Sequence, residues 1–185
     1  MARAACRPRR CRPLIQLQST DFELFDVPPR FAQDGAVLDA RWKALQREVH
    51  PDRFAAQGAA AQRVAAQWSA RINEAHRRLK DPLRRAAYLC ELRGAPIEAE
   101  RNTAMPPAFL MQQMALREQL DAARDAAELG AIEALAARMQ RELLQEIEQQ
   151  LDADRAWAAA AQSVRALMFL DKLAADIERR RDTLA

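Results

Sequence analysis

The stretch that follows Pro107 most constrains the fold of this chain, because it contains no further proline and only one glycine, Gly130. Proline breaks helices and glycine weakens them, so this stretch favours long helices. Apolar residues recur every three or four positions over 107–123, 128–151 and 153–184, as on one face of a helix. The spacing follows the helical period and not a sustained heptad, so we expect an antiparallel three-helix bundle and not a long coiled coil.

The first half of the chain predicts shorter helices. Ser19, Thr20 and Asp21 can cap a short helix that ends before Pro28. A second helix is expected from Asp34 to Pro51, a third over about 60–80, and a short one in "LRRAAYLCEL". Apolar stripes on the two longer helices predict that they bury one face each. These stripe residues are Leu38, Trp42, Leu45 and Val49, then Val64, Trp68, Ile72, Ala75 and Leu79.

Composition excludes several classes of protein. Half of the 185 residues are apolar and 30% are charged, and no apolar run approaches the roughly 20 residues that span a bilayer. The net charge of +3 is small and mixed in sign along the chain, which does not indicate nucleic-acid binding. Three cysteines, an odd number, indicate a reducing compartment, and Cys90 is expected in or near the core.

The first eighteen residues carry five arginines and no acid. A mitochondrial transit peptide would explain this composition, but prolines at 8 and 13 interrupt the amphipathic helix that it needs. A disordered basic extension, or a start codon placed too early, is the favoured alternative. Cys6 and Cys11 lack a second pair of ligands for zinc. We expect residues 1–18 to be a disordered basic extension without a metal site.

The tripeptide His50-Pro51-Asp52 allows a catalytic, a metal-binding or a purely structural interpretation. Catalysis is the weakest of these, because Ser69 and Ser163 fall inside predicted helices and neither a phosphate-binding loop nor a zinc motif is found. Proline would end the helix, and Asp52 could accept hydrogen bonds from backbone amides. Taken alone, the tripeptide indicates a turn.

The surroundings of this tripeptide resemble a J-domain. The order is a short aromatic helix, a basic amphipathic helix, "HPD", a loop, a helix ending in "INEAHRRLKDP", and "LRRAAYL". The tripeptide alone is a modest signal, but these motifs in this order and spacing are specific. The residues that carry the resemblance are His50, Pro51, Asp52, Arg53, Phe54, Ile72, Asn73, Glu74, Ala75, Leu79, Asp81, Pro82, Arg84, Arg85 and Tyr88.

The second half extends the resemblance to one family of J-type co-chaperones. "RRAAYLCELRGAPIEAERNTAMPPAFLMQQMALREQLDAAR" and "VRALMFLDKLAADIE" resemble the iron–sulfur cluster assembly co-chaperones of the HscB family. The likeness covers nearly the whole chain from Asp21 onward. The resemblance implies a J-domain that stimulates a DnaK-type (HscA-like) ATPase chaperone and a bundle that binds an IscU-like scaffold protein.

The resemblance also implies two sets of contact residues. The chaperone would contact His50, Pro51 and Asp52, together with Arg41, Lys43 and Arg47 on the preceding helix. The scaffold would contact Leu110, Met111, Met114, Glu118 and Phe169.

Each set also has a plainer interpretation. The cations could form an ordinary solvated face, and the apolar residues could belong to the bundle core, as we expect of Leu116 and Leu120. The family often carries acids where this chain has Ala115 and Ala122, so hydrophobic contact would carry more of the scaffold affinity.

These observations predict an all-α adaptor without enzymatic activity or cofactor. We expect a J-domain over 19–93, a linker over 94–106 and a three-helix, scaffold-binding domain over 107–185. Bacterial cytoplasm is favoured over the mitochondrial matrix, without membrane or nucleic-acid partners. The alternative is a general J-protein whose bundle only oligomerises or holds unfolded clients.

Overall fold

The computed structural model describes residues 18–98 and 105–184, and every regular element in this part of the chain is helical, as predicted. The predicted basic extension lies almost entirely outside the described residues. The elements are α1 (Asp21–Phe25), α2 (Gly35–Val49), the 3₁₀ segment η1 (Pro51–Gln57), α3 (Ala59–Lys80), α4 (Pro82–Leu92), α5 (Pro107–Ala122), α6 (Ala126–Glu148), the π-helical segment η2 (Gln149–Ala153) and α7 (Trp157–Leu184).

Side-chain caps fix where several helices begin. Thr20 accepts a hydrogen bond from the backbone of Glu23, whose carboxylate in turn accepts from the backbone N–H of Thr20. Asp34, Asp81 and Asp125 cap α2, α4 and α6 through their carboxylates. Each cap satisfies backbone N–H groups that lack a partner inside the helix, so these starts are determined locally.

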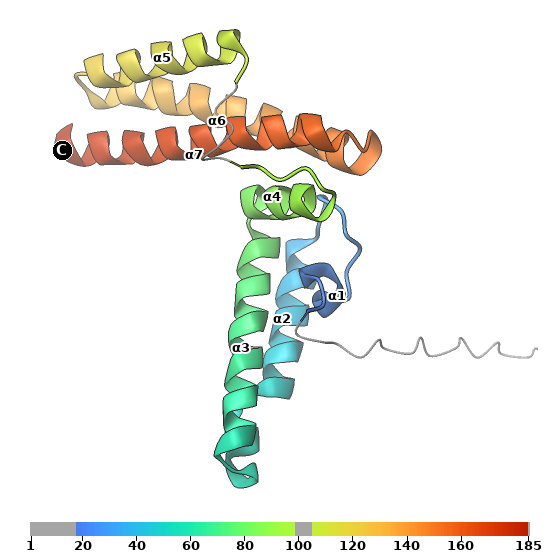
Figure 1. Ribbon diagram of the computed structural model, residues 1–185. Coiled ribbons are helices and arrows are strands. Elements are labelled where there is room, and N and C mark those ends of the chain that lie inside the picture. Colours follow the sequence, from blue (N-terminus) through green and yellow to red (C-terminus); the bar gives the residue numbers. More distant parts are fainter. Residues whose placement is uncertain (1–17, 99–104, 185) are drawn as a thin grey trace, which may run out of the picture.

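The hairpin of α2 and α3 forms the long arm of the molecule (Figure 1). Leu38 and Leu45 on α2 are buried with Ile72 and Leu79 on α3, as the stripes predicted. The prediction for Val64 is wrong, because its side chain is 53% exposed. The stripe of α3 passes through its neighbour Ala65 instead, which is buried and keeps the spacing of three and four residues to Trp68 and Ile72.

The second half forms the predicted bundle of α5, α6 and α7. α6 and α7 pack along each other most extensively, and α5 runs alongside them on the side away from the hairpin (Figure 1). α6 ends in η2, which turns the chain and buries Leu151. α7 therefore begins at Trp157, four residues later than the predicted start at Ala153.

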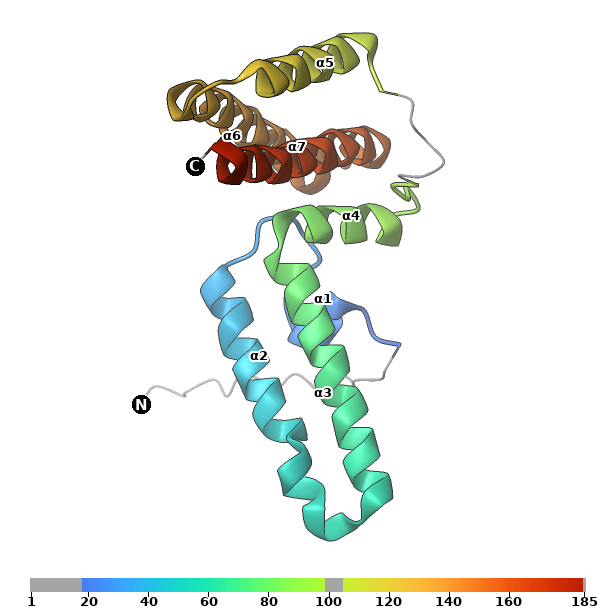
Figure 2. The same cartoon turned by 90° about the vertical axis from the view of Figure 1, so that its left-hand side faces the viewer.

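The two halves share one hydrophobic core. α4 lies between the hairpin and the bundle and packs against α7 (Figure 2). Leu89 and Cys90 belong to the same buried cluster as Val164 and Leu167 of α7. Ile97, inside the predicted linker, is only 6% exposed and belongs to this cluster as well. The hairpin is thus joined to the bundle through α4.

Candidate functional site

The turn that ends α2 presents His50 and Asp52 to solvent. Pro51 cannot continue the helix, and the chain enters η1 from an extended conformation at His50. The imidazole Nδ1 accepts a hydrogen bond from the backbone N–H of Asp52 at 3.3 Å and lies 3.5 Å from its carboxylate. The two side chains are 56% and 88% exposed. This arrangement suits recognition by another protein better than a water-excluding reaction centre.

The basic residues of α2 do not behave as one group. Lys43 and Arg47 are exposed, and Arg53 donates to the backbone carbonyl of Arg47 at 2.8 Å, which ties η1 to the end of α2. Arg41 instead donates to the carboxylate of Asp26 at 2.8 Å. Its charge is therefore partly neutralised, unlike that expected of a freely projecting cation.

Asn73, from the "INEA" motif, joins the two helices of the hairpin. Its side-chain oxygen accepts from the indole N–H of Trp42 at 2.8 Å and from the amide of Gln46 at 2.7 Å. Below this link, His76 stacks on Trp42 and lies 2.8 Å from Asp39. These contacts hold the end of α2 at a fixed position along α3, and with it the turn at His50.

Asp39 also pairs with Lys80, at the end of α3. The ammonium of Lys80 donates to both of its carboxylate oxygens at 2.8 Å. Hydrogen bonds from Lys80 and then from His76 hold the pKa of Asp39 below its usual value. The pairing fixes the base of the hairpin, next to α4.

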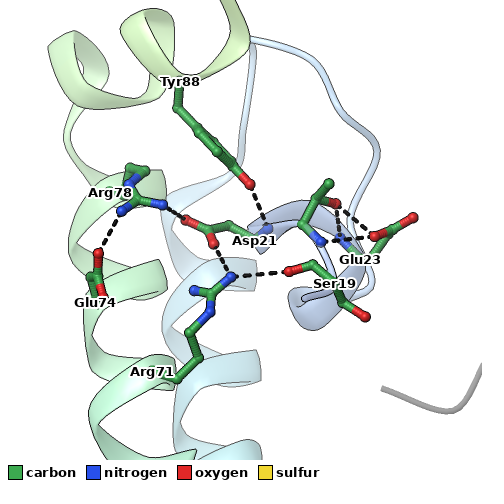
Figure 3. A network of polar contacts seen from close by, with 8 residues as sticks. Ser19, Asp21, Glu23, Arg71, Glu74, Arg78 and Tyr88 are labelled. Carbon is green, nitrogen blue, oxygen red and sulfur yellow. Dashed lines mark hydrogen bonds and ion pairs between the residues drawn. The ribbon is translucent and has the colours of Figure 1, made fainter. Parts of the chain in front are cut away.

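A buried ionic cluster fixes α1 against α3 and α4 (Figure 3). Asp21 is fully buried, and its carboxylate lies 2.5 Å from Arg71 and 3.0 Å from Arg78. Its backbone N–H donates to the hydroxyl of Tyr88 at 3.0 Å. Arg78 covers the ring of Tyr88 and also pairs with Glu74 at 2.5 Å. Burial raises the pKa of the Tyr88 hydroxyl, which stays protonated. The motif residues Glu74 and Tyr88 in this cluster therefore stabilise the packing of α1 on α3 and α4.

The outer face of α5 carries an apolar patch, which we define as Leu110, Met111 and Met114. Their side chains are 42%, 71% and 62% exposed, respectively. The opposite face is buried through Leu116 and Leu120, which confirms the expectation that those two belong to the core. Since α5 already buries one apolar face, the patch is not needed for packing within the bundle and is open to contact with another protein.

Phe169 of α7 is only half-buried, yet both helices hold it in place. Its ring meets Phe109 edge to face, with ring centroids 6.1 Å apart. The guanidinium of Arg117 lies over it, 4.8 Å from the ring centre. Phe169 thus joins α5 to α7. It supports the helix that carries the patch and is not itself an exposed part of the patch.

Phe109 and Arg117 were missed in the sequence, although one signal could have found them. They lie four residues to either side of Gln113, which is buried, and so fall on the same side of α5. Glu118 is exposed on α5, as are Ala115 and Ala122.

The described residues provide neither a metal-binding cluster nor a membrane-spanning helix. Within residues 18–98 and 105–184, no group of three histidine, cysteine or acidic side chains is placed to hold a metal ion. In the same part of the chain, no helix is long and apolar enough to cross a membrane.

Comparison with known proteins gives one consistent result. Residues 105–178 match the family described as "HSCB C-terminal oligomerisation domain". The chain is 48% identical to a co-chaperone protein HscB homolog of Burkholderia multivorans over 167 residues, which cover 89% of this chain and 95% of that protein.

Solved structures agree. The chaperone HscB from Vibrio cholerae superposes with a TM-score of 0.78 and 41% identity, covering 90% of this chain and all of that one. The human co-chaperone protein HscB gives a TM-score of 0.87 and 25% identity, covering 99% of this chain and 96% of that one.

Proposed function

The chain belongs to the HscB co-chaperone family, and from that premise we propose that it carries an iron–sulfur cluster scaffold protein to a DnaK-type ATPase chaperone. It is a co-chaperone of iron–sulfur cluster assembly. The partners are an IscU-like scaffold and an HscA-like chaperone. The observation that carries the proposal is that two exposed surfaces, the turn at His50 and the patch on α5, lie at opposite ends of one packed molecule (Figure 1). The hairpin and α7 share one buried cluster, and α5 packs on α6 and α7 through a second.

The chaperone binds at the end of α2. His50, Pro51 and Asp52 form the contact, and Lys43 and Arg47 attract an acidic surface of the chaperone, which speeds encounter. Arg41 contributes less, because Asp26 neutralises part of its charge. ATP hydrolysis takes place on the chaperone, and no proton transfer is required of His50.

The scaffold binds the patch. Leu110, Met111 and Met114 supply apolar contact, and the flexible thioethers adapt to the surface that they meet. Glu118 adds a negative charge beside the patch, while Phe169 keeps α5 and α7 in register below it.

Binding both partners on one rigid body raises the effective concentration of the scaffold near the chaperone. The shared core of α4, α7 and the residues around Ile97 supports this geometry, because it leaves the hairpin little freedom to swing. The bacterial relatives support a place in the bacterial cytoplasm.

A three-component binding experiment tests the proposal. The immobilised chain should retain purified scaffold and ATP-loaded chaperone together, and the stimulated ATPase rate should rise further when scaffold is present. Retention of chaperone without scaffold would refute the carrier role and favour a general J-protein.

Self-association is a second candidate function of the bundle, favoured by the description of the matching family as an oligomerisation domain. Sedimentation equilibrium over a hundredfold range of protein concentration distinguishes it. A monomeric mass at every concentration would exclude self-association and leave scaffold binding as the proposed function of the bundle.

A further inference from the structure

The methionines within the described residues are not equally accessible. Met111 and Met114 are 71% and 62% exposed and lie three residues apart on one face of α5. Met139 lies in the bundle core at 8% exposure, and its sulfur accepts a hydrogen bond from the side-chain amide of Gln112 at 3.7 Å. Met168 is also exposed, but less so, at 38%. Among the described methionines, the sulfurs of the patch are therefore the most accessible to an oxidant in solution.

Met111 and Met114 combine an oxidisable side chain with a position in the apolar patch. Oxidation of methionine turns a flexible apolar side chain into a polar sulfoxide and disrupts methionine-rich interfaces. Here two of the three residues of the patch carry the oxidisable sulfur, and Leu110 alone would remain apolar. The acids that could compensate at Ala115 and Ala122 are absent from this chain. Binding through the patch thus depends on the thioether form.

We propose that Met111 and Met114 form a reversible oxidation site that switches off scaffold binding. Hydrogen peroxide transfers one oxygen atom to each sulfur. The sulfur lone pair attacks the peroxide, the O–O bond breaks, a sulfur–oxygen bond forms, and the second oxygen leaves as water. Each sulfur is oxidised by two electrons and each peroxide is reduced. Thiol-dependent methionine sulfoxide reductases reverse the step.

The switch leaves the rest of the molecule intact. Both sulfurs project from the outer face of α5, away from the buried face with Leu116 and Leu120, so their oxidation places no polar atom in the core. The turn at His50 lies at the other end of the molecule (Figure 1) and contains no methionine. Oxidised protein therefore still stimulates the chaperone but no longer brings the scaffold to it.

The experiment treats the full chain with hydrogen peroxide and follows each methionine by peptide mass spectrometry. Scaffold affinity is then titrated by calorimetry before and after treatment. We expect Met111 and Met114 to oxidise well before Met139, and the scaffold Kd to rise by about tenfold or more, the size of losing an apolar contact at an interface centre. Methionine sulfoxide reductases should restore the original Kd.

Two variants isolate the site. In Met111→Leu/Met114→Leu the ratio of Kd after and before peroxide should stay near one, whatever the starting affinity of that variant. Met168→Leu is the matched control, because it removes an exposed methionine outside the patch, and its ratio should equal that of the unaltered chain.

Three results would overturn the inference: oxidation of Met139 as fast as that of the patch, an unchanged Kd after oxidation, or an equal loss in the double leucine variant. The inference rests on the proposed scaffold binding. If the untreated chain does not bind the scaffold, the proposed function itself fails and the inference falls with it, a result seen before any peroxide is added.

Discussion

The carboxylate of Asp152 lies 2.6 Å from the backbone nitrogen of Phe31, 121 residues earlier in the chain. Its second oxygen accepts from the N–H of Ala32 at 2.8 Å. One side chain of η2 thus satisfies two backbone donors of the loop before α2. Arg85 stacks on the ring of Phe31, 4.9 Å from its centre. Burial lowers the pKa of that guanidinium, while nearby carboxylates, among them that of Asp152, oppose the effect. These contacts lock the hairpin to the bundle.

Asp152→Ala should therefore destabilise the whole protein. The substitution leaves the backbone N–H groups of Phe31 and Ala32 without their hydrogen-bond acceptor. We expect a loss of about 1–3 kcal/mol in the free energy of unfolding. Urea unfolding followed by circular dichroism measures it. Asp154→Ala is the control, because its carboxylate accepts only a surface hydrogen bond from Gln149, and its effect should stay within about 0.5 kcal/mol. Equal losses in both variants would contradict the role of Asp152.

His50→Gln should abolish stimulation of the chaperone. The side chain is exposed and its contacts are confined to its own turn, so the fold should keep its melting temperature. We expect the stimulated ATPase rate to fall by about tenfold or more, as on loss of an interface hot spot. Scaffold affinity should not change. Arg84→Gln, on α4 at the opposite end of the hairpin, is the matched surface control. Undiminished stimulation by His50→Gln would refute the proposed contact.

Met111→Ala and Phe169→Ala should separate contact from support. Met111 is mostly exposed, so its removal should lower scaffold affinity about tenfold while stability changes by less than about 0.5 kcal/mol. Phe169 packs between Phe109 and Arg117, so its removal should lower affinity and also cost about 2 kcal/mol of stability.

Calorimetric titration and thermal unfolding give the two quantities for each variant. Gln145→Ala, exposed on α6, should change neither. Scaffold binding by Met111→Ala at the original affinity would remove Met111 from the site.

Cys90 should react only when the protein unfolds. Burial raises the pKa of its thiol from the ordinary 9.0 to about 11. At pH 8 the thiolate is then about 100-fold scarcer than in an exposed cysteine, and the side chain is also covered. The Cys6→Ser/Cys11→Ser variant leaves Cys90 as the only thiol. Its labelling by a disulfide reagent should be at least about 100-fold slower in buffer than in urea.

The same shift predicts a pH dependence. The folded state holds the Cys90 proton more tightly, so this contribution to stability is present below the unfolded pKa of about 9 and is lost as the pH rises through about 11.

In the labelling experiment, rapid reaction of Cys90 in the folded protein at pH 8 would contradict the prediction and show that the α4–α7 contact opens readily.

Much of this protein was predictable from local sequence. Periodic apolar residues predicted the helices, Asp34 predicted a helix start, and the pattern of α5 separated buried Leu116 from exposed Met111. Each of these features depends on residues within one or two helical turns, where spacing alone fixes which side chains share a face.

Other features depend on which distant surfaces meet. Nothing near Asp152 in the sequence indicates the two amides that it binds, and the stripe through Val64 could not show that Ala65 would face the core instead. Arg41 was predicted to contact the chaperone, and nothing in its own helix indicated that Asp26, fifteen residues earlier, would pair with it.

The sequence by itself therefore determined the helices, the turn at His50 and the exposed methionines. Only the tertiary structure decided how the hairpin is fixed on the bundle, because local periodicity specifies the face that a helix buries but not the partner that covers it.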